Sequence, residues 1–184
     1  MRLKITSILT FLAALAVAPV LAQDAATADQ NFPTAEALAD EANGVVARHG
    51  DWQVRCAPEG NNCRMFQAGF DSEGNEIANI SLQPLPEGSA ALLGASVVTP
   101  LLTLLPRGVT MGVDDGVPAA YPYSWCDRAG CYARFGMTAG QVDAMKAGNS
   151  AYLSLYAIVD QTKEIRASIS LTGFTDAFDD LMAR

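Results

Sequence analysis

Two closely spaced pairs of cysteines constrain the fold of this chain more than any other feature of its sequence. In the segment Tyr121–Phe135, two aromatic-rich runs flank a loop of four residues that ends in Gly130, and Cys126 and Cys131 border that loop. Such a loop is typical of a β-hairpin. Opposed residues of antiparallel strands lie about 4.5–5.5 Å apart at Cα, a distance that a disulfide spans. Cys56 and Cys63 flank a second, six-residue loop in the same way.

Four cysteines allow three pairings. Hairpin geometry favours the local pairing, Cys56 with Cys63 and Cys126 with Cys131, although each of these loops is short and contributes only about 2–2.5 kcal/mol by chain entropy. A crosswise pairing would contribute about 4 kcal/mol per bond, but no feature of the sequence indicates it. We predict the local pairing, with the crosswise pairing as the alternative.

The N-terminus predicts an exported protein. Arg2 and Lys4 precede an apolar run from Ile8 to Val17, and Val20-Leu21-Ala22 has the small-residue pattern of a cleavage site. The alternative, a membrane anchor, needs about 20 apolar residues. We therefore predict that residues 1–22 are a signal peptide, that the mature chain has no transmembrane segment, and that it is periplasmic, outer-membrane-associated or secreted. In such compartments cysteines form disulfides.

The charge of the chain limits its partners. The full sequence has 12 basic and 20 acidic residues and a formal net charge of −8. Two of the basic residues and none of the acidic ones fall in the predicted signal peptide, so the mature charge is −10. Such a surface repels the phosphate backbone of nucleic acids and anionic lipid surfaces. We exclude nucleic acid as a partner.

The remaining chain predicts one all-β domain after a flexible, Ala- and Asp-rich segment over residues 23–48. From residue 49 to 184, short alternating or β-branched runs are separated by turns, which indicates an antiparallel β-sandwich. Strands are expected at 52–56, 64–69, 77–82, 90–99, 109–113, 119–125, 131–135, 151–159 and 165–171, with 101–105 as a short strand or a loop. Thr138 and Gln141 form a capping box for one short helix near 138–147 that ends at Gly148. Phe174, Phe178 and Leu181 indicate a short C-terminal helical turn.

No residue pattern indicates catalysis or a metal. His49 is the single histidine, which argues against a zinc site and against a serine nucleophile with a histidine base. The turn Asp71–Glu76 resembles a calcium loop only weakly. The cysteine spacings differ from the Cys-x-x-Cys pattern of thiol-exchange enzymes. Paired carboxylates remain open, because their separation cannot be determined from the sequence. We predict no catalytic residue, no metal ligand and no cofactor.

An aromatic row is the remaining candidate site. Tyr121, Tyr123 and Trp125 occupy alternate positions of one expected strand, so their side chains share a face. Aromatic rows on sheets bind carbohydrate or peptide, but they also fill cores. We take these three residues as the candidate binding surface, with core packing as the alternative.

Several segments together resemble the invasion-associated locus B family. They are His49–Cys56, Cys63 with Gln67, Leu104–Val113, Tyr121–Cys131, Met145–Gly148 and Ser170–Phe178. Members are exported proteins of Gram-negative bacteria, and the family name comes from entry into host red cells. The resemblance implies an immunoglobulin-like β-sandwich and no established enzymatic activity.

These observations give one leading functional hypothesis and two alternatives. The leading hypothesis is a non-enzymatic envelope protein that binds an envelope or host-surface protein or glycan. The alternatives are an envelope hydrolase or thiol-active enzyme, and a structural protein that maintains the envelope.

Overall fold

The computed structural model describes residue 40 and residues 43–184. The predicted signal peptide, residues 1–22, lies outside the described residues, as does most of the predicted flexible segment over residues 23–48. The described chain contains β1 (Val45–His49), β2 (Trp52–Arg55), β3 (Arg64–Phe70), β4 (Glu76–Pro84), β5 (Leu93–Thr99), β6 (Val109–Val113), β7 (Ala119–Tyr121), β8 (Tyr123–Cys126), β9 (Cys131–Met137), β10 (Ser150–Ala157), β11 (Asp160–Ser170), a short 3-10 helix η1 (Leu105–Arg107), α2 (Ala139–Ala147) and α3 (Phe174–Met182).

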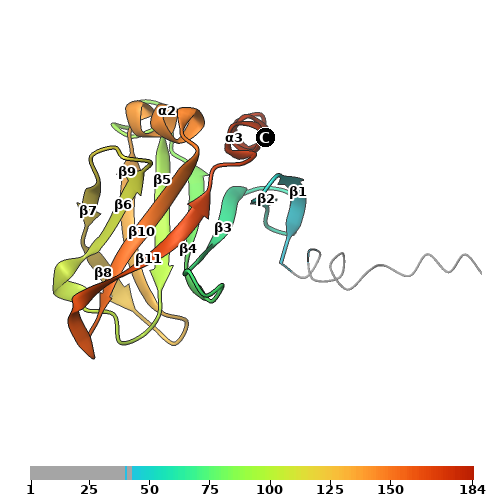
Figure 1. The fold of residues 1–184 in the computed structure, drawn as a ribbon. Helices are drawn as coiled ribbons and strands as arrows, with labels where there is room; N and C mark the ends of the chain where they lie inside the picture. Colours follow the sequence, from blue (N-terminus) through green and yellow to red (C-terminus); the bar gives the residue numbers. More distant parts are fainter. Residues whose placement is uncertain (1–39, 41–42) are drawn as a thin grey trace, which may run out of the picture. The chain divides into compact units, whose positions relative to one another are not determined.

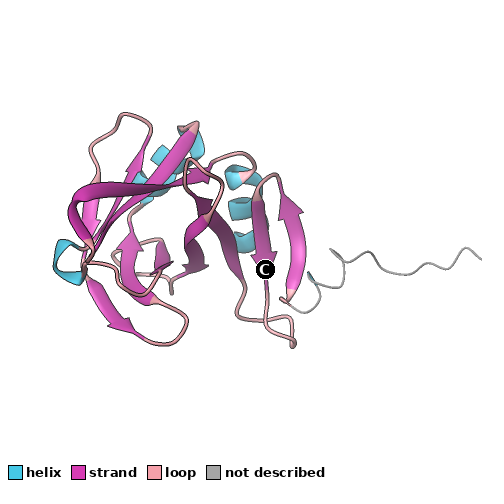
Figure 2. Ribbon diagram, turned by 60° about the horizontal axis from the view of Figure 1, so that its bottom comes forward, coloured by secondary structure: helices cyan, strands magenta, loops and turns pink. Residues whose placement is uncertain are grey.

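The strands form one antiparallel sheet, which confirms the all-β prediction. The order is β7-β6-β10-β11-β3-β4-β5-β9-β8, and β1 and β2 extend from β3. The sheet folds over so that β6, β10 and β11 lie in one layer and β4, β5 and β9 in the other (Figures 1 and 2). Side chains from both layers belong to a single apolar core, including Ile80, Leu82, Val97, Leu153 and Ile169. The sandwich is therefore made from two halves of one continuous sheet.

The fold between the two layers occurs where β3 meets β11. Only one residue pair, Ser168 with Phe70, joins these strands. A Cβ at Gly69 would lie 2.8 Å from the side chain of Ile169, so glycine allows the close approach. The buried side chain of Gln67 completes the ladder: its amide donates to the carbonyl of Ser170 (3.0 Å) and accepts from the N–H of Ser170 (2.6 Å).

The expected single strand over residues 119–125 is wrong. Pro122 divides it into β7, which pairs with β6, and β8, which pairs with β9. Proline has no N–H for a ladder and favours breaks and edges. Because β7 and β8 are the two ends of the strand order, the chain crosses at Pro122 from one end of the sheet to the other. The sheet is thereby nearly closed.

The ordered sheet begins earlier than residue 49. β1 starts at Val45 and pairs with β2, with His49 opposite Trp52. The intervening Gly50 has φ +55°, and a Cβ there would lie 2.5 Å from the carbonyl oxygen of Thr172. The sequence pattern failed here because only alternate positions of β1 are half-buried and none is fully buried. The first described strand thus begins four residues before the domain start expected at residue 49.

Both predicted helices are present. Thr138 caps α2 through the expected box: its N–H donates to Oε1 of Gln141 (2.9 Å), and its hydroxyl accepts from the N–H of Gln141 (3.4 Å). The predicted C-terminal turn is a full helix, α3. It buries Phe174, Ala177, Phe178 and Leu181, an i, i+3, i+4, i+7 stripe. Tertiary packing of that stripe stabilises a helix that local propensity alone does not predict.

The disulfides have the predicted local pairing. They join Cys56 to Cys63 and Cys126 to Cys131, each with a Cα–Cα distance of 4.0 Å.

The segment over residues 101–105 was expected to be a short strand or a loop. It is a turn followed by the start of η1, with Leu102 at φ +69°. In the part of the chain described, no helix has the length and apolarity needed to span a membrane.

Candidate functional site

The structure places the three predicted aromatic residues at the Pro122 crossing, on two strands. Tyr121 ends β7, and Tyr123 and Trp125 belong to β8. All three line one shallow hollow of about 360 Å³, together with the segment from Leu105 to Gly108. The structure brings them together, but they do not form the expected row on one strand. Each side chain has a different environment.

Tyr121 is a packing residue. Its ring stacks on Phe135, with the ring centroids 3.5 Å apart and the planes at 6°. Its hydroxyl accepts a hydrogen bond from Nε2 of Gln141 on α2 (2.7 Å). The half-buried ring and the satisfied hydroxyl attach α2 to the closed edge of the sheet.

Tyr123 is also committed to the fold. It is half-buried against the core, and Oγ1 of the buried Thr99 donates to its hydroxyl (3.1 Å). Burial raises the pKa of the Tyr123 phenol. The Thr103 hydroxyl donates to the carbonyl of Pro100 (2.7 Å), and its Oγ1 lies 3.2 Å from Oγ1 of Thr99. The core-packing alternative therefore applies to Tyr121 and Tyr123.

Trp125 differs, because 45% of it is exposed. The ladder between β8 and β9 shifts register between Tyr123 and Trp125, and such a bulge re-aims side chains. Trp125 lies opposite Tyr132 and stacks on it, with centroids 4.9 Å apart and planes at 12°. The next residue, Cys126, forms the disulfide to Cys131 that closes the hairpin. Trp125 is thus an exposed aromatic on a covalently closed hairpin.

A groove on the outer face of the sheet also includes Trp125. This Trp125 groove, about 300 Å³ in volume, crosses β3, β4, β5, β9 and β8. Its side chains include Arg64, Ser81, Ser96, Trp125, Tyr132 and Arg134. Ser81 pairs with Ser96, and Ser96 with Arg134, so the three lie in a row across neighbouring strands.

The Trp125 groove is basic within an acidic protein. Among the described residues, none that lines it is acidic. Neither Arg64 nor Arg134 forms an ion pair within that part of the chain, and Cζ of Arg134 lies 6.0 Å from the Trp125 ring. Arg55 lies beside the groove over the Phe66 ring (3.4 Å), and burial, followed by the charge of Arg64, lowers its pKa.

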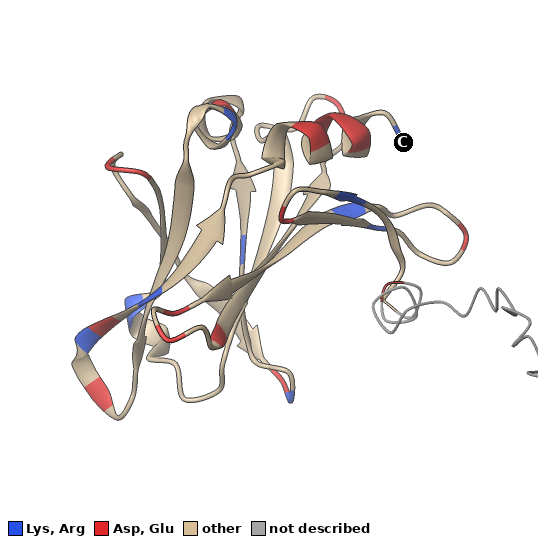
Figure 3. Cartoon of the chain, turned by 45° about the vertical axis from the view of Figure 1, so that its right-hand side comes forward, with Lys and Arg blue, Asp and Glu red and all other residues tan. Residues whose placement is uncertain are grey.

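Acidic side chains lie mainly elsewhere. Figure 3 marks the acidic residues along the backbone, and their positions include loops and α3. The hairpin acid Asp127 does not line the groove, but its carboxylate interacts with Tyr132, which does. Burial raises the pKa of Tyr132, and the Asp127 carboxylate raises it further, since a negative charge disfavours a phenolate. The Trp125 groove is therefore the surface where a cation-bearing face and an exposed aromatic meet.

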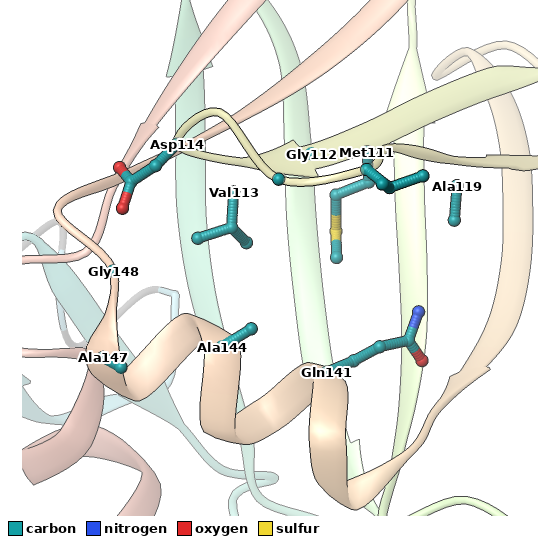
Figure 4. Close-up of a pocket in the computed structure, with 11 residues that line it drawn as sticks. Met111, Gly112, Val113, Asp114, Ala119, Gln141, Ala144, Ala147 and Gly148 are labelled. Carbon is teal, nitrogen blue, oxygen red and sulfur yellow. The ribbon is translucent and has the colours of Figure 1, made fainter.

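A second hollow lies between α2 and the β6–β7 hairpin (Figure 4). Its volume is about 360 Å³, and most of its lining is apolar or glycine. Asp114 lies at one end and Gln141 at the other (Figure 4). The Asp114 carboxylate accepts from the N–H groups of Asn149 (3.0 Å) and Ser150 (2.9 Å), which lower its pKa. Both polar side chains are already hydrogen-bonded within the fold.

His49 and the Asp71–Glu76 turn, the candidates for catalysis or metal binding in the sequence, have structural partners. Nε2 of His49 donates to Asp180 (2.9 Å), which also accepts from Arg184 (3.0 Å), so this histidine holds α3. Asp71 accepts from the N–H groups of Glu73 (2.8 Å) and Asn75 (2.9 Å) and closes its turn. Within residue 40 and residues 43–184, no three His, Cys, Asp or Glu side chains are placed to hold a metal ion.

Sequence reasoning missed the polar residues of the Trp125 groove. Arg64, Ser81, Ser96 and Arg134 alternate with buried neighbours along their strands, so their outward direction was a readable signal. Their grouping was not, because it depends on the register between β4, β5 and β9.

Comparison with known proteins gives consistent matches. Residues 52–182 match the family described as "Invasion associated locus B (IalB) protein". The chain is 25% identical over 152 residues to the invasion protein B homologs of Brucella abortus strain 2308 and of Brucella abortus biovar 1 strain 9-941, covering 81% of this chain and 86% of each homolog.

A solved structure has the same fold. The crystal structure of invasion associated protein B from Bartonella henselae aligns with a TM-score of 0.64 at 20% identity, over 74% of this chain and 95% of that one. At this identity the likeness supports the fold alone.

Proposed function

Because this chain belongs to the invasion-associated locus B family, we propose that it is an exported, non-enzymatic protein of the cell envelope. It binds its partner through the surface around Trp125. The relatives are named for invasion, and contact with a host surface is part of this proposal.

One observation carries the proposal: Trp125 is a large aromatic side chain, 45% exposed, on a hairpin fixed by a disulfide. Exposed tryptophans at rigid positions are enriched among residues that dominate binding energy. The hairpin costs little ordering entropy on binding because the disulfide and the Tyr132 stack already fix it.

The compartment is proposed on two supports. Both cysteine pairs are disulfides, which persist in oxidising compartments such as the periplasm. The sequence begins with the pattern of a secretory signal. Both fit an envelope protein of this family.

The test compares two aromatic residues of matched exposure. The oxidised protein, purified after export and fluorescently labelled, is titrated onto cell envelopes from the producing bacterium and onto red cells. Phe70→Ala is the control, because Phe70 is 44% exposed against 45% for Trp125. We expect Trp125→Ala to weaken saturable binding about 30-fold, the effect of a hot spot of about 2 kcal/mol, and Phe70→Ala to leave it unchanged.

Two results would overturn the proposal. One is equal binding by wild type and Trp125→Ala. The other is hydrolysis or thiol exchange catalysed by the wild-type protein, which would favour an enzyme. A third outcome would favour a structural role: no saturable binding by the wild-type protein, together with loss of envelope integrity in bacteria that lack it.

A further inference from the structure

We propose that the Trp125 groove binds an acidic oligosaccharide, a short chain of sugars that carries carboxylate groups. The inference rests on the proposed function and names the ligand class of the same surface. It is drawn from three kinds of side chain that the groove brings together: an aromatic face, paired hydroxyls and unpaired guanidinium groups.

The aromatic face is the first element. Trp125 and Tyr132 stack in nearly parallel planes, at 12°, so one ring supports the other while Trp125 remains 45% exposed. The apolar face of a sugar ring packs on such a flat aromatic surface. The disulfide next to Trp125 holds this surface before a ligand arrives.

The hydroxyl row is the second element. Ser81, Ser96 and Arg134 are cross-strand neighbours, and Gln83 borders the same groove. The two serines are half-buried, and within the described residues neither hydroxyl forms a hydrogen bond with another side chain of the groove. Hydroxyl and amide groups donate and accept hydrogen bonds, as sugar hydroxyls require. This row lies on rigid strands instead of loops.

The cations are the third element. Arg64 on β3 and Arg134 on β9 are three strand steps apart, about 14 Å at the backbone. Both line the groove, with Arg64 on the strand at one end of its span and Arg134 on the strand next to β8 at the other. A guanidinium binds a carboxylate with two parallel hydrogen bonds. An uncharged sugar chain would leave the positive charge of both arginines unpaired.

The net charge of the protein restricts the ligand to a short one. A long polyanion meets the repulsion of a strongly acidic protein. At physiological salt that repulsion is screened within about 8 Å, so a few sugars inside the groove experience mainly Arg64 and Arg134. The same arginines make the binding sensitive to salt.

The experiment uses tetragalacturonate as the probe and its methyl ester, which lacks the charges, as the matched comparison. Both are titrated calorimetrically into the oxidised full protein at low and at physiological salt. We expect saturable binding of tetragalacturonate, at least about tenfold weaker binding of the ester, and weaker binding as salt rises. Arg134→Gln, Arg64→Gln and Trp125→Ala should each reduce binding about tenfold or more. The charge-matched control Lys163→Gln, an exposed cation on β11, should leave it unchanged.

Four results would overturn the inference. Equal affinity for the methyl ester would show that the carboxylate charges of the ligand do not contribute to binding. Equal affinity for a hexaglutamate peptide would make the groove a site for acidic peptides. Binding of inorganic sulfate alone would make it an anion site without sugar recognition. If tetragalacturonate fails while Trp125-dependent binding to envelopes persists, the ligand class is wrong and the proposed function stands. Thermal unfolding of each variant verifies that its fold is intact.

Discussion

The two disulfide-closed hairpins each carry one of the two tryptophans of the chain, and the structure uses them in opposite ways. Trp52, four residues before Cys56, is fully buried. Its ring contacts Phe174 edge-on at 5.2 Å, and its Nε1 donates to the carbonyl of Ser170 (2.9 Å). Trp125, next to Cys126, is 45% exposed, and its ring stacks on that of Tyr132 on the neighbouring strand β9.

The difference shows that a disulfide fixes a hairpin without deciding which side of it faces the core. β2 lies under α3, and its inward positions hold Trp52 and Val54. β8 is at one end of the strand order that the described residues form, and its bulge turns Trp125 outward. Position in the sheet therefore makes Trp52 a structural residue and leaves Trp125 available for binding.

The largest expected effect is on the buried side of this comparison. Trp52→Ala should lower the free energy of unfolding by about 3–5 kcal/mol, because it leaves a cavity under α3 and removes a buried hydrogen bond. Urea denaturation followed by circular dichroism measures this change. A loss below about 1 kcal/mol would mean that α3 does not depend on Trp52.

Removing either disulfide should lower the stability of the fold, but only one of the two removals should also weaken binding. The double substitutions Cys56→Ala with Cys63→Ala, and Cys126→Ala with Cys131→Ala, should each cost about 2–2.5 kcal/mol, since the loops are of similar length. Only the second pair should also weaken envelope binding, because it frees the Trp125 hairpin. Equal losses of binding in both variants would contradict the division between the two hairpins.

Trp125→Ala should have a smaller effect on stability than Trp52→Ala, about 1 kcal/mol from the lost stack on Tyr132. Chemical unfolding of the same protein batch that is used for binding gives both quantities. The prediction fails if Trp125→Ala destabilises the fold as strongly as Trp52→Ala does.

The smallest expected effect is on the pH dependence of stability, through Asp180. Hydrogen bonds from Arg184 and then from His49 hold the pKa of Asp180 below its ordinary value. A lowered folded-state pKa stabilises the protein above the unfolded pKa, and this contribution is lost as pH falls through the lowered pKa. Asp180→Asn should therefore lower the melting temperature at pH 7, and the difference from wild type should shrink as pH falls below the ordinary aspartate pKa of 3.8. A constant difference across this range would assign the effect to packing.

Some of this architecture could be predicted from the sequence, and the reasons are local. Thr138 and Gln141 predicted α2 because a capping box needs only residues close in sequence. The cysteine spacing favoured the observed pairing because each loop is a hairpin.

What could not be predicted depends on contacts between distant segments. Pro122 indicated a break, but not that the chain there changes its strand partner. The length of α3 depends on packing against β2 and β1, and the Trp125 groove depends on the register of five strands. Arg64 and Arg134 are seventy residues apart in number, and only the fold places them on one groove.

The most direct test of the central claim uses the fluorescence of each tryptophan alone. The chain has two tryptophans, so Trp52→Phe reports Trp125 and Trp125→Phe reports Trp52. Each variant is titrated with tetragalacturonate. The account predicts a saturable change in the emission of Trp52→Phe and none in that of Trp125→Phe. A change confined to Trp125→Phe, or no change in either variant, would contradict it.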